Sequence, residues 1–263
     1  MSFISLTTDF GLRDGTVGVM KGVIWSIAPE AKIADLSHQI EPQNVRQAAI
    51  LLEAHAFYFP ENTVHVVVVD PGVGTGRRPI AAQVGNQRFV GPDNGVFSGV
   101  LAGAERHGWP VNIVHTDKPE YWLPTISDIF HGRDIFSPVA AYLVSGVPLA
   151  KLGTSIDNPI RFSLPRPQKT EQGIAGQVIH IDHFGNMISN IHRDEVDASQ
   201  NVEVILNKTK ISGLARTFGE RPSGELIALY SSTGYLMVAA VNGSAAERIK
   251  AHVGDEITVT KVG

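Results

Sequence analysis

Apolar positions in the first part of the chain follow two spacings in turn, one typical of strands and one typical of helices. A short apolar run at 3–8 predicts a strand, and apolar residues at helical spacing follow it until Pro29 ends the run. The succession then repeats. It predicts further strands at 32–36, 64–69, 80–84, 87–90 and 111–114, and helices at 17–27, 43–57, 95–104 and 135–144. Such a pattern favours a mostly parallel sheet between helices, with a short antiparallel excursion at 80–90.

The pattern changes after a polar, proline-rich stretch at 164–173, which is typical of a linker. Short strands separated by turn residues follow it, and we predict them at 174–181, 202–206, 226–230, 235–240 and 256–262. We therefore interpret the chain as a Rossmann-like α/β domain over 1–163, a linker, and a smaller all-β domain over 174–263.

Composition narrows the class of protein. The 263 residues are 43% hydrophobic and 18% charged, which is ordinary for a globular protein with a sizeable core. A net charge of −4, with no dense basic cluster beyond Arg77-Arg78, argues against nucleic-acid binding. The absence of cysteine excludes disulfides and thiolate chemistry. No apolar stretch approaches the ~20 residues that span a bilayer, and the N-terminus lacks the basic region of a signal peptide, so we expect a cytoplasmic protein.

The strand at 64–69 is a near-continuous run of valines that ends on Asp70. A glycine-rich loop follows directly and carries Arg77 and Arg78. Ligands of parallel sheets bind beyond the carboxyl ends of the strands, which favours a ligand site here. The loop lacks the Lys-Ser/Thr ending of a phosphate-binding loop and the third glycine of a dinucleotide motif. A tight turn that needs glycine for its dihedral angles is the structural alternative.

Three more polar clusters accompany this loop, at 7–14, 130–134 and 180–186. His131 in the second cluster is either a site residue or a core or capping histidine. In the third cluster His180, Asp182 and His183 suggest a metal site. Alternation along a strand would, however, place His183 on the opposite face from the other two. A turn in which Asp182 and Asn186 bond to local backbone is the preferred interpretation.

Together these clusters resemble motifs of the S-adenosyl-L-methionine hydrolases, also called SAM hydroxide adenosyltransferases. The motifs span nearly the whole chain in the family's order. They are Thr8-Asp9-Phe10-Gly11, Asp70-Pro71-Gly72-Val73-Gly74-Thr75 with Arg77, Pro92-Asp93-Asn94-Gly95, Phe130-His131-Gly132-Arg133-Asp134-Ile135-Phe136 and Ile181-Asp182-His183-Phe184-Gly185-Asn186.

The resemblance implies an enzyme that splits S-adenosyl-L-methionine with water into adenosine and L-methionine, with no cofactor and no metal. The family's catalytic Asp, Arg and His fall on Asp70, Arg77 and His131. The resemblance also implies a homotrimer, in which each site lies between the first domain of one subunit and the second domain of the next.

Ligand contacts carry over in the same way, as implications of the resemblance. Asp9 would hold the ribose hydroxyls, and Asp14 and Thr16 would lie near the methionine end. Asp182 would bind the methionine ammonium and Ser232 its carboxylate. The residues expected to line the adenine pocket are Phe184, Asn186, Phe218 and Asn242.

The residue types suit this reaction. A sulfonium leaves as a neutral thioether, so the main task is to orient a weak nucleophile, water, in line with the C5′–S bond. Asp70 and His131 would accept or orient that water, and Arg77 would pair with Asp70 and fix its direction. The pattern leaves open which of Asp70 and His131 takes the proton, because the two would titrate together.

Two further functions are open at this point. One is transfer to halide, but the fluorinating relatives carry tyrosine in place of Asp70, serine in place of Gly132, and an insertion where only 85–88 separates two strands here. An anionic carboxylate would also repel halide. The other is a binding module without turnover. Three departures from the family pattern, at Gln43, Ile129 and Thr233, affect binding more than the reacting groups.

Overall fold

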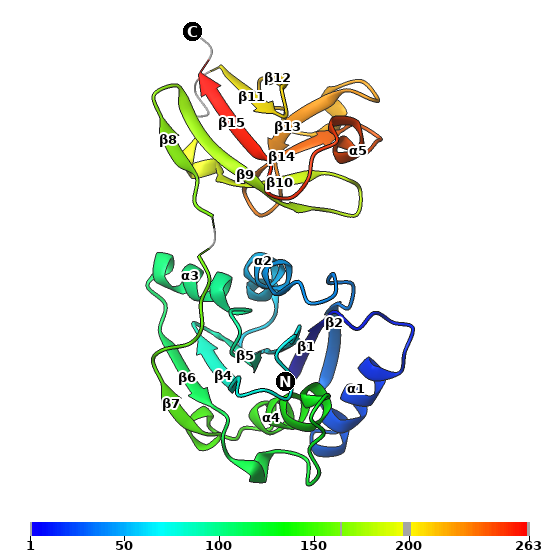
Figure 1. Cartoon of the computed structure of the whole chain (residues 1–263), viewed down its shortest axis with the longest axis vertical. Coiled ribbons are helices and arrows are strands. Elements are labelled where there is room, and N and C mark those ends of the chain that lie inside the picture. Colours follow the sequence, from blue (N-terminus) through cyan, green and yellow to red (C-terminus); the bar gives the residue numbers. More distant parts are fainter. Residues whose placement is uncertain (1, 164, 197–200, 262–263) are drawn as a thin grey trace. The chain divides into compact units, whose positions relative to one another are not determined.

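The structure is a computed structural model that describes residues 2–163, 165–196 and 201–261. The chain divides into two compact units, Met1–Ser163 and Leu164–Gly263, both of which are drawn in Figure 1. We call them unit 1 and unit 2.

Unit 1 is built on one seven-stranded sheet in the order β2-β1-β3-β5-β4-β6-β7. Its strands are β1 (Phe3–Thr8), β2 (Lys32–Ser37), β3 (Val64–Val68), β4 (Pro79–Val84), β5 (Gln87–Pro92), β6 (Val111–His115) and β7 (Thr154–Ile156). The pairs β2-β1, β1-β3 and β3-β5 are parallel, whereas β5-β4, β4-β6 and β6-β7 are antiparallel. The sheet is therefore mixed. The expectation of a mostly parallel sheet was wrong beyond β5, because the β4–β5 hairpin reverses the chain and β6 and β7 continue antiparallel.

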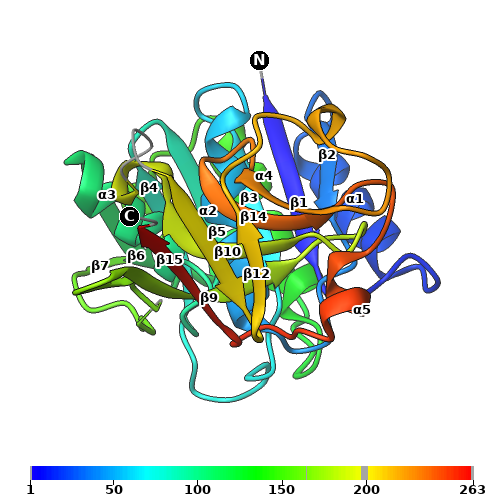
Figure 2. The same cartoon turned by 90° about the horizontal axis from the view of Figure 1, so that it is seen from above.

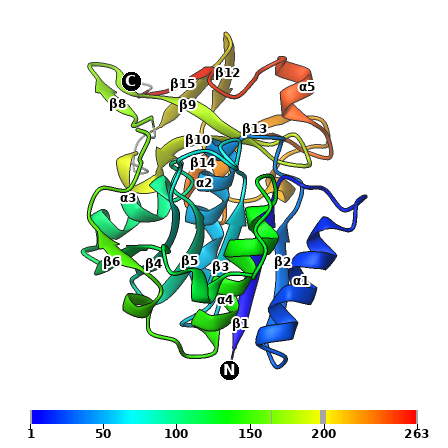
Figure 3. The ribbon, with the colours of Figure 1, turned by 60° about the horizontal axis from the view of Figure 1, so that its bottom comes forward.

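Helices cover both faces of this sheet. They are α1 (Thr16–Ile27), α2 (Val45–His55), α3 (Ser98–His107) and α4 (Ser137–Val144), with short 3₁₀ turns at Ala56–Tyr58, Pro119–Tyr121 and Leu149–Lys151. One core forms where α1 and α4 pack on the sheet, and a second where α2 and α3 pack on the other face. Figures 1 and 3 show α1 and α4 together on one side and α2 and α3 on the other.

The sequence explains the central elements of unit 1. All five residues of β3 are buried, as the valine run predicted for a strand covered on both faces. Val17, Met20 and Ile24 form the buried stripe of α1. Asn44 caps α2 by accepting from the backbone N–H of Gln47, so this helix begins two residues later than predicted.

Unit 2 is an antiparallel, barrel-like arrangement in the order β12-β11-β15-β9-β10-β14-β13, with β8 also paired to β9 (Figure 2). Its strands are β8 (Gln168–Thr170), β9 (Gly173–Ile181), β10 (Met187–His192), β11 (Val202–Leu206), β12 (Thr209–Ser212), β13 (Leu226–Tyr230), β14 (Tyr235–Ala240) and β15 (Glu256–Lys261). The two ends of the order approach each other, because the N–H of Ala215 donates to the carbonyl of Ala228 in β13 (2.8 Å).

Unit 2 also differs from the prediction in several segments. It contains a short helix, α5 (Ala245–Ile249), and 3₁₀ turns at Arg193–Glu195 and Phe218–Glu220, so it is not all-β. The strands β10 and β12 were not predicted, and β8 forms inside the predicted linker. Residue 262, the end of the last predicted strand, lies outside the described residues. Within the described part of the chain, no helix is long and apolar enough to cross a membrane.

Candidate active site

The loop after β3 folds back on its own first residue. The carbonyl of Asp70 accepts from the N–H of Val73 (3.2 Å), which closes the first turn. Gly74 then adopts a φ of +75°, and a Cβ at this position would lie only 2.3 Å from the carbonyl oxygen of Asp128. This position therefore requires glycine on both dihedral and steric grounds. The turn at Asp70–Val73 and the left-handed backbone at Gly74 together reverse the chain, so that Arg77 lies against Asp70.

Asp70 and Arg77 form a buried, multiply bonded ion pair. The Nε of Arg77 donates to Oδ1 and Oδ2 of Asp70 at 2.9 Å each, and Nη2 donates to Oδ2 at 2.5 Å. Their side chains are only 5% and 7% exposed. The guanidinium carbon of Arg77 also lies 5.1 Å from the ring centre of Phe136. The pair therefore fixes the direction of the carboxylate.

His131 completes the cluster through the same guanidinium. Nη2 of Arg77 lies 2.8 Å from Nδ1 of His131. A guanidinium only donates hydrogen bonds, so Nδ1 accepts, and the neutral imidazole carries its proton on Nε2. Burial lowers the pKa of His131, and the positive charge of Arg77 lowers it further. His131 is therefore neutral at pH 7.

A π-helical turn, Gly132–Phe136, follows His131 directly and leads into α4. Such turns are rare and often occur at functional sites. A Cβ on Gly132 would lie 3.2 Å from Cγ1 of Val68 and 3.3 Å from the Phe130 ring. The close approach to β3 explains why glycine follows His131.

Asp9 lies directly after β1, at the same edge of the sheet as Asp70, because β1 and β3 are parallel neighbours. Its Oδ2 accepts from the backbone N–H of Gln43 (2.8 Å), which has a left-handed φ of 64°. Gln43, one of the departures from the family pattern, thus contacts the predicted ribose-binding residue.

Asp14 and Thr16, predicted near the methionine end, lie in the loop before α1 and at the first residue of α1. Asp14 is exposed and Thr16 is half-buried. Ile129, another departure, is 81% exposed and lies two residues before His131.

In unit 2, the turn between β9 and β10 is organised by Asp182. Oδ1 of Asp182 accepts from the backbone N–H groups of Phe184 and Asn186, each at 2.9 Å. Oδ2 accepts from the side-chain Nδ2 of Asn186 at 2.8 Å. The predicted turn is confirmed for Asp182, whereas the side chain of Asn186 bonds to the Asp182 carboxylate and not to local backbone. Phe184 in the same turn is 72% exposed.

Two more predicted adenine residues lie in other loops of unit 2. The carbonyl of Gly185 in the turn accepts from the N–H of Ala246 (3.0 Å), which ties the turn to α5, the helix that follows the loop with Asn242. Asn242 is exposed, with a φ of 55°. Phe218 begins a 3₁₀ turn and is 41% exposed. In the described part of unit 2, no hydrogen bond joins Phe218 to the Asp182 turn.

Ser232 lies at the other end of β10 from Asp182. Ser232 occupies the β13–β14 turn beside Tyr235, and Tyr235 pairs with His192 at the end of β10. At the start of β10, next to Asn186, Met187 pairs with Val238. The three steps from Val238 to Tyr235 alone span about 10 Å. Asp182 and Ser232 therefore lie towards opposite ends of β10.

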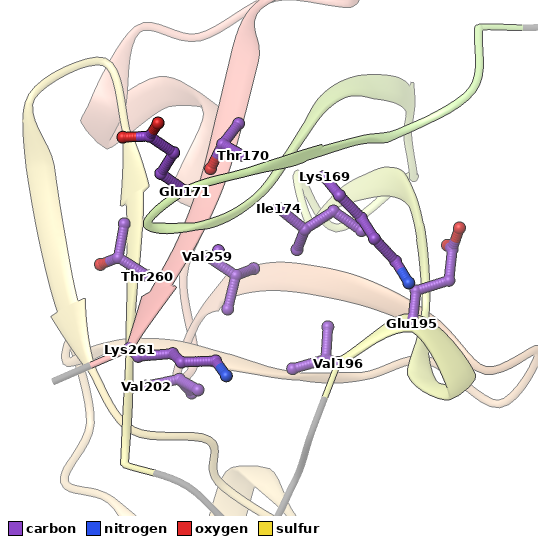
Figure 4. Close-up of a pocket in the computed structure, with 11 residues that line it drawn as sticks. Lys169, Thr170, Glu171, Ile174, Glu195, Val196, Val202, Val259, Thr260 and Lys261 are labelled. Carbon is purple, nitrogen blue, oxygen red and sulfur yellow. The ribbon is translucent and has the colours of Figure 1, made fainter.

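Two cavities lie away from these residues. One, of about 320 Å³, lies on unit 2 between β8, β9 and β15, with Lys169, Glu195 and Lys261 on its wall (Figure 4). The other, of about 460 Å³, includes Arg88, which pairs with the first residue of β3 and so lies at the opposite end of that strand from Asp70. The Arg88 guanidinium donates to the last turn of α4, at the carbonyl of Leu143 (3.1 Å), a structural role.

No group of three or more His, Asp or Glu side chains placed to hold a metal ion occurs among residues 2–163, 165–196 and 201–261.

Sequence reasoning missed the residues that brace the Asp9 loop. The side chains of Thr8 and buried His38 are hydrogen-bonded (2.8 Å), and His38 Nε2 lies 3.0 Å from Oδ1 of Asp35. The carbonyl of His38 also accepts from Gly11 (2.8 Å). The available signal was a polar Asp35-Leu36-Ser37-His38 run at the carboxyl end of β2, next to β1.

The candidate site thus has two parts: a buried cluster of Asp70, Arg77 and His131 in unit 1, beyond the carboxyl ends of parallel strands, and a turn in unit 2 that exposes the ring of Phe184. The chain belongs to the SAM hydroxide adenosyltransferase family: the N-terminal domain model matches residues 4–153 and the C-terminal domain model residues 176–258.

Individual relatives agree with this assignment. An (R)-S-adenosyl-L-methionine hydrolase from Salinispora arenicola is 38% identical over 98% of this chain and 97% of its own length. A fluorinase from Actinoplanes sp. is 26% identical over 98% of this chain and 97% of its own length. The crystal structure of an uncharacterized conserved protein from Thermotoga maritima superposes with a TM-score of 0.91 at 37% identity, covering 98% of this chain and all of that one.

Proposed function

We propose that this protein hydrolyses S-adenosyl-L-methionine to adenosine and L-methionine by attack of an oriented water at C5′. The observation that carries the proposal is the buried guanidinium of Arg77, which bridges Asp70 and His131. The family assignment and the Salinispora hydrolase at 38% identity support the same substrate and reaction.

The hydrogen bonds divide the work between Asp70 and His131. Since Nδ1 of His131 accepts from Arg77, its Nε2–H is a donor and orients the attacking water through an oxygen lone pair. Asp70 is then the acceptor in the cluster. A carboxylate offers about four lone-pair positions and Arg77 supplies three contacts, so one position is left for the water.

The step balances without an acid on the leaving group. A lone pair of water forms the C5′–O bond while the C5′–S electrons go to sulfur, which leaves as the neutral thioether of methionine. The attacking water then gives one proton to Asp70, which passes it to solvent. Holding the water in line is the main contribution of the cluster.

The remaining ligand contacts are proposals from the family pattern. Asp9 would hold the ribose hydroxyls, and Asp14 and Thr16 would lie near the methionine. Asp182 would bind the methionine ammonium, and Ser232 would meet the methionine carboxylate. Phe184, Asn186, Phe218 and Asn242 would receive the adenine. We also propose a homotrimer in which each site lies between the first domain of one subunit and the second domain of the next, because the family pattern implies this arrangement.

We further propose that unit 1 is Rossmann-like, that the reaction is independent of metal, and that the protein is cytoplasmic. The parallel strands β2, β1, β3 and β5, with the Asp70 cluster at their carboxyl edge, support the first.

A halide-using transfer is the second candidate within the same class, favoured by the fluorinase relative. Asp70 argues against it, since a carboxylate would repel a halide at the position of the water. Gly132 argues against it as well, since even a Cβ is tightly confined there.

Product analysis tests the proposal. Purified protein is incubated with S-adenosyl-L-methionine, with and without chloride, and products are separated by liquid chromatography. Adenosine and methionine in both samples are expected. A 5′-chlorinated nucleoside would indicate halide transfer, and retained, unconverted ligand would indicate a binding module.

A further inference from the structure

The carboxylate of Asp182 determines which way the amide of Asn186 points. Nδ2 of Asn186 lies 2.8 Å from Oδ2 of Asp182. A carboxylate only accepts hydrogen bonds, so the NH₂ group of Asn186 must face it. The opposite amide orientation would place two acceptor oxygens against each other. Asn186 is 93% buried and held at its backbone by the same carboxylate, so the amide is fixed.

This orientation leaves one acceptor and one donor of Asn186 for a ligand. In the described part of unit 2, neither Oδ1 of Asn186 nor the second N–H of its Nδ2 has a hydrogen-bond partner. Two residues before it, the ring of Phe184 is 72% exposed and offers a stacking surface. An oriented amide next to an exposed ring suits a flat heteroaromatic ligand.

We propose that Asp182 is a positioning residue that makes the site selective for 6-aminopurines over 6-oxopurines. The proposal rests on the proposed adenosyl substrate. Oδ1 of Asn186 accepts from the 6-amino group and its free N–H donates to N7, the pairing that an asparagine makes with adenine.

Selectivity depends on Asp182 because an unrestrained asparagine reads both bases. A 6-oxopurine presents an acceptor where adenine presents a donor, and a free amide would simply rotate to match it. With Asp182 in place, rotation would bring Oδ1 of Asn186 onto the carboxylate. The 6-oxopurine therefore meets an acceptor that it cannot satisfy.

The substitution Asp182→Asn tests this directly. Its Oδ1 still accepts from the backbone N–H groups of Phe184 and Asn186, so the turn is retained. Its new NH₂ group favours the opposite orientation of the Asn186 amide, which then presents a donor to the base. Asp255→Asn is the matched control, because Asp255 also accepts from a backbone N–H and an asparagine amide, those of His252 and Asn207.

The measurement is isothermal titration calorimetry with adenosine and inosine on the full chain. The wild type and Asp255→Asn are expected to prefer adenosine by about tenfold or more, and Asp182→Asn to lose or reverse that preference. An unchanged preference in folded Asp182→Asn, checked by circular dichroism, overturns the proposal. So does an unchanged preference combined with weaker binding only of ligands that carry the methionine ammonium.

A second variant covers the case in which Asp182→Asn does not fold. Asn186→Ala keeps the bond from Asp182 to the backbone of residue 184 and is expected to bind adenosine and inosine equally. A wild-type preference in Asn186→Ala contradicts the proposal. Failure of the wild type to bind either nucleoside or S-adenosyl-L-methionine contradicts the proposed function itself, and the inference with it.

Discussion

Asp70 in unit 1 and Asp182 in unit 2 occupy similar places, since each follows a strand and begins a glycine-containing turn. Their partners differ. Asp70 is held by the Arg77 guanidinium, which also bonds to His131, whereas Asp182 is held by backbone N–H groups and the Asn186 amide. A carboxylate held by a guanidinium in a buried site is fixed in direction and can still offer a lone pair for chemistry. A carboxylate held by its own turn shapes a surface for recognition.

The largest effect should separate these two roles. Asp70→Asn is expected to lower kcat by about 10³-fold, because the proton acceptor and the direction of the water are lost. Asp182→Asn is expected to change kcat by less than about tenfold and to act mainly through KM, because it alters substrate recognition and leaves the Asp70 cluster unchanged. Steady-state kinetics on both variants, with melting curves to verify folding, checks the difference. An equal loss of kcat in the two variants would contradict the different roles given to Asp70 and Asp182.

Acid should also act differently on the two units. Burial lowers the pKa of His65, in β3 of unit 1, to about 4. In the unfolded chain the same histidine has a pKa of about 6.5. The stability that neutral His65 contributes is therefore complete above pH 6.5 and is lost as the pH falls towards 4. The shift corresponds to about 3 kcal/mol. Urea unfolding at pH 7 and at pH 5 can be monitored by hydrogen exchange, which reports on each unit separately. The free energy of unfolding is expected to fall more in unit 1 than in unit 2 at pH 5. Equal weakening of both units would contradict this.

Activity should follow the protonation of His131. Because its pKa is lowered, kcat/KM is expected to be constant at neutral pH and to fall on the acid side with an apparent pKa below 6.5. Removing the positive charge with Arg77→Gln raises the pKa of His131 and moves the acid limb to higher pH, on top of a lower rate. A pH profile of the two proteins measures this. An acid limb that stays in place would argue that Arg77 does not act on His131.

The smallest expected effect concerns the packing behind His131. Gly132→Ala is expected to cost about 1 kcal/mol, because the new methyl group meets Val68 and Phe130 at 3.2 and 3.3 Å. Gly76→Ala is the matched control, since a Cβ there has open space. Thermal unfolding of both variants tests the contrast, and equal melting temperatures would contradict it.

The sequence predicted the Asp70 end of the comparison better than the Asp182 end. The valine run indicated a buried β3, and the return of Arg77 onto Asp70 is local, since the two are seven residues apart. The antiparallel β4–β5 hairpin was predicted and is confirmed. The antiparallel pairing of β6 and β7 was missed, because β6 carries apolar residues much as a parallel strand does. The pairing of β10 with β14, which separates Asp182 from Ser232, is a property of register and not of either segment alone.

The orientation of side chains was also beyond the sequence. The pattern left open whether Asp70 or His131 takes the proton, and only the 2.8 Å contact from Arg77 to Nδ1 distinguishes them. In the same way, the motif at 180–186 identified Asp182 and Asn186, but not that one fixes the amide of the other.

The most direct test of the central claim is the source of the oxygen in the product. The protein is incubated with S-adenosyl-L-methionine in ¹⁸O-water, and the 5′-oxygen of the adenosine is examined by mass spectrometry of its ribose fragment, with Asp70→Asn as the comparison. Attack of an oriented water at C5′ predicts label at the 5′-hydroxyl in the wild type and almost no adenosine in the variant. Unlabelled adenosine, or labelled adenosine formed equally fast without Asp70, would contradict the account.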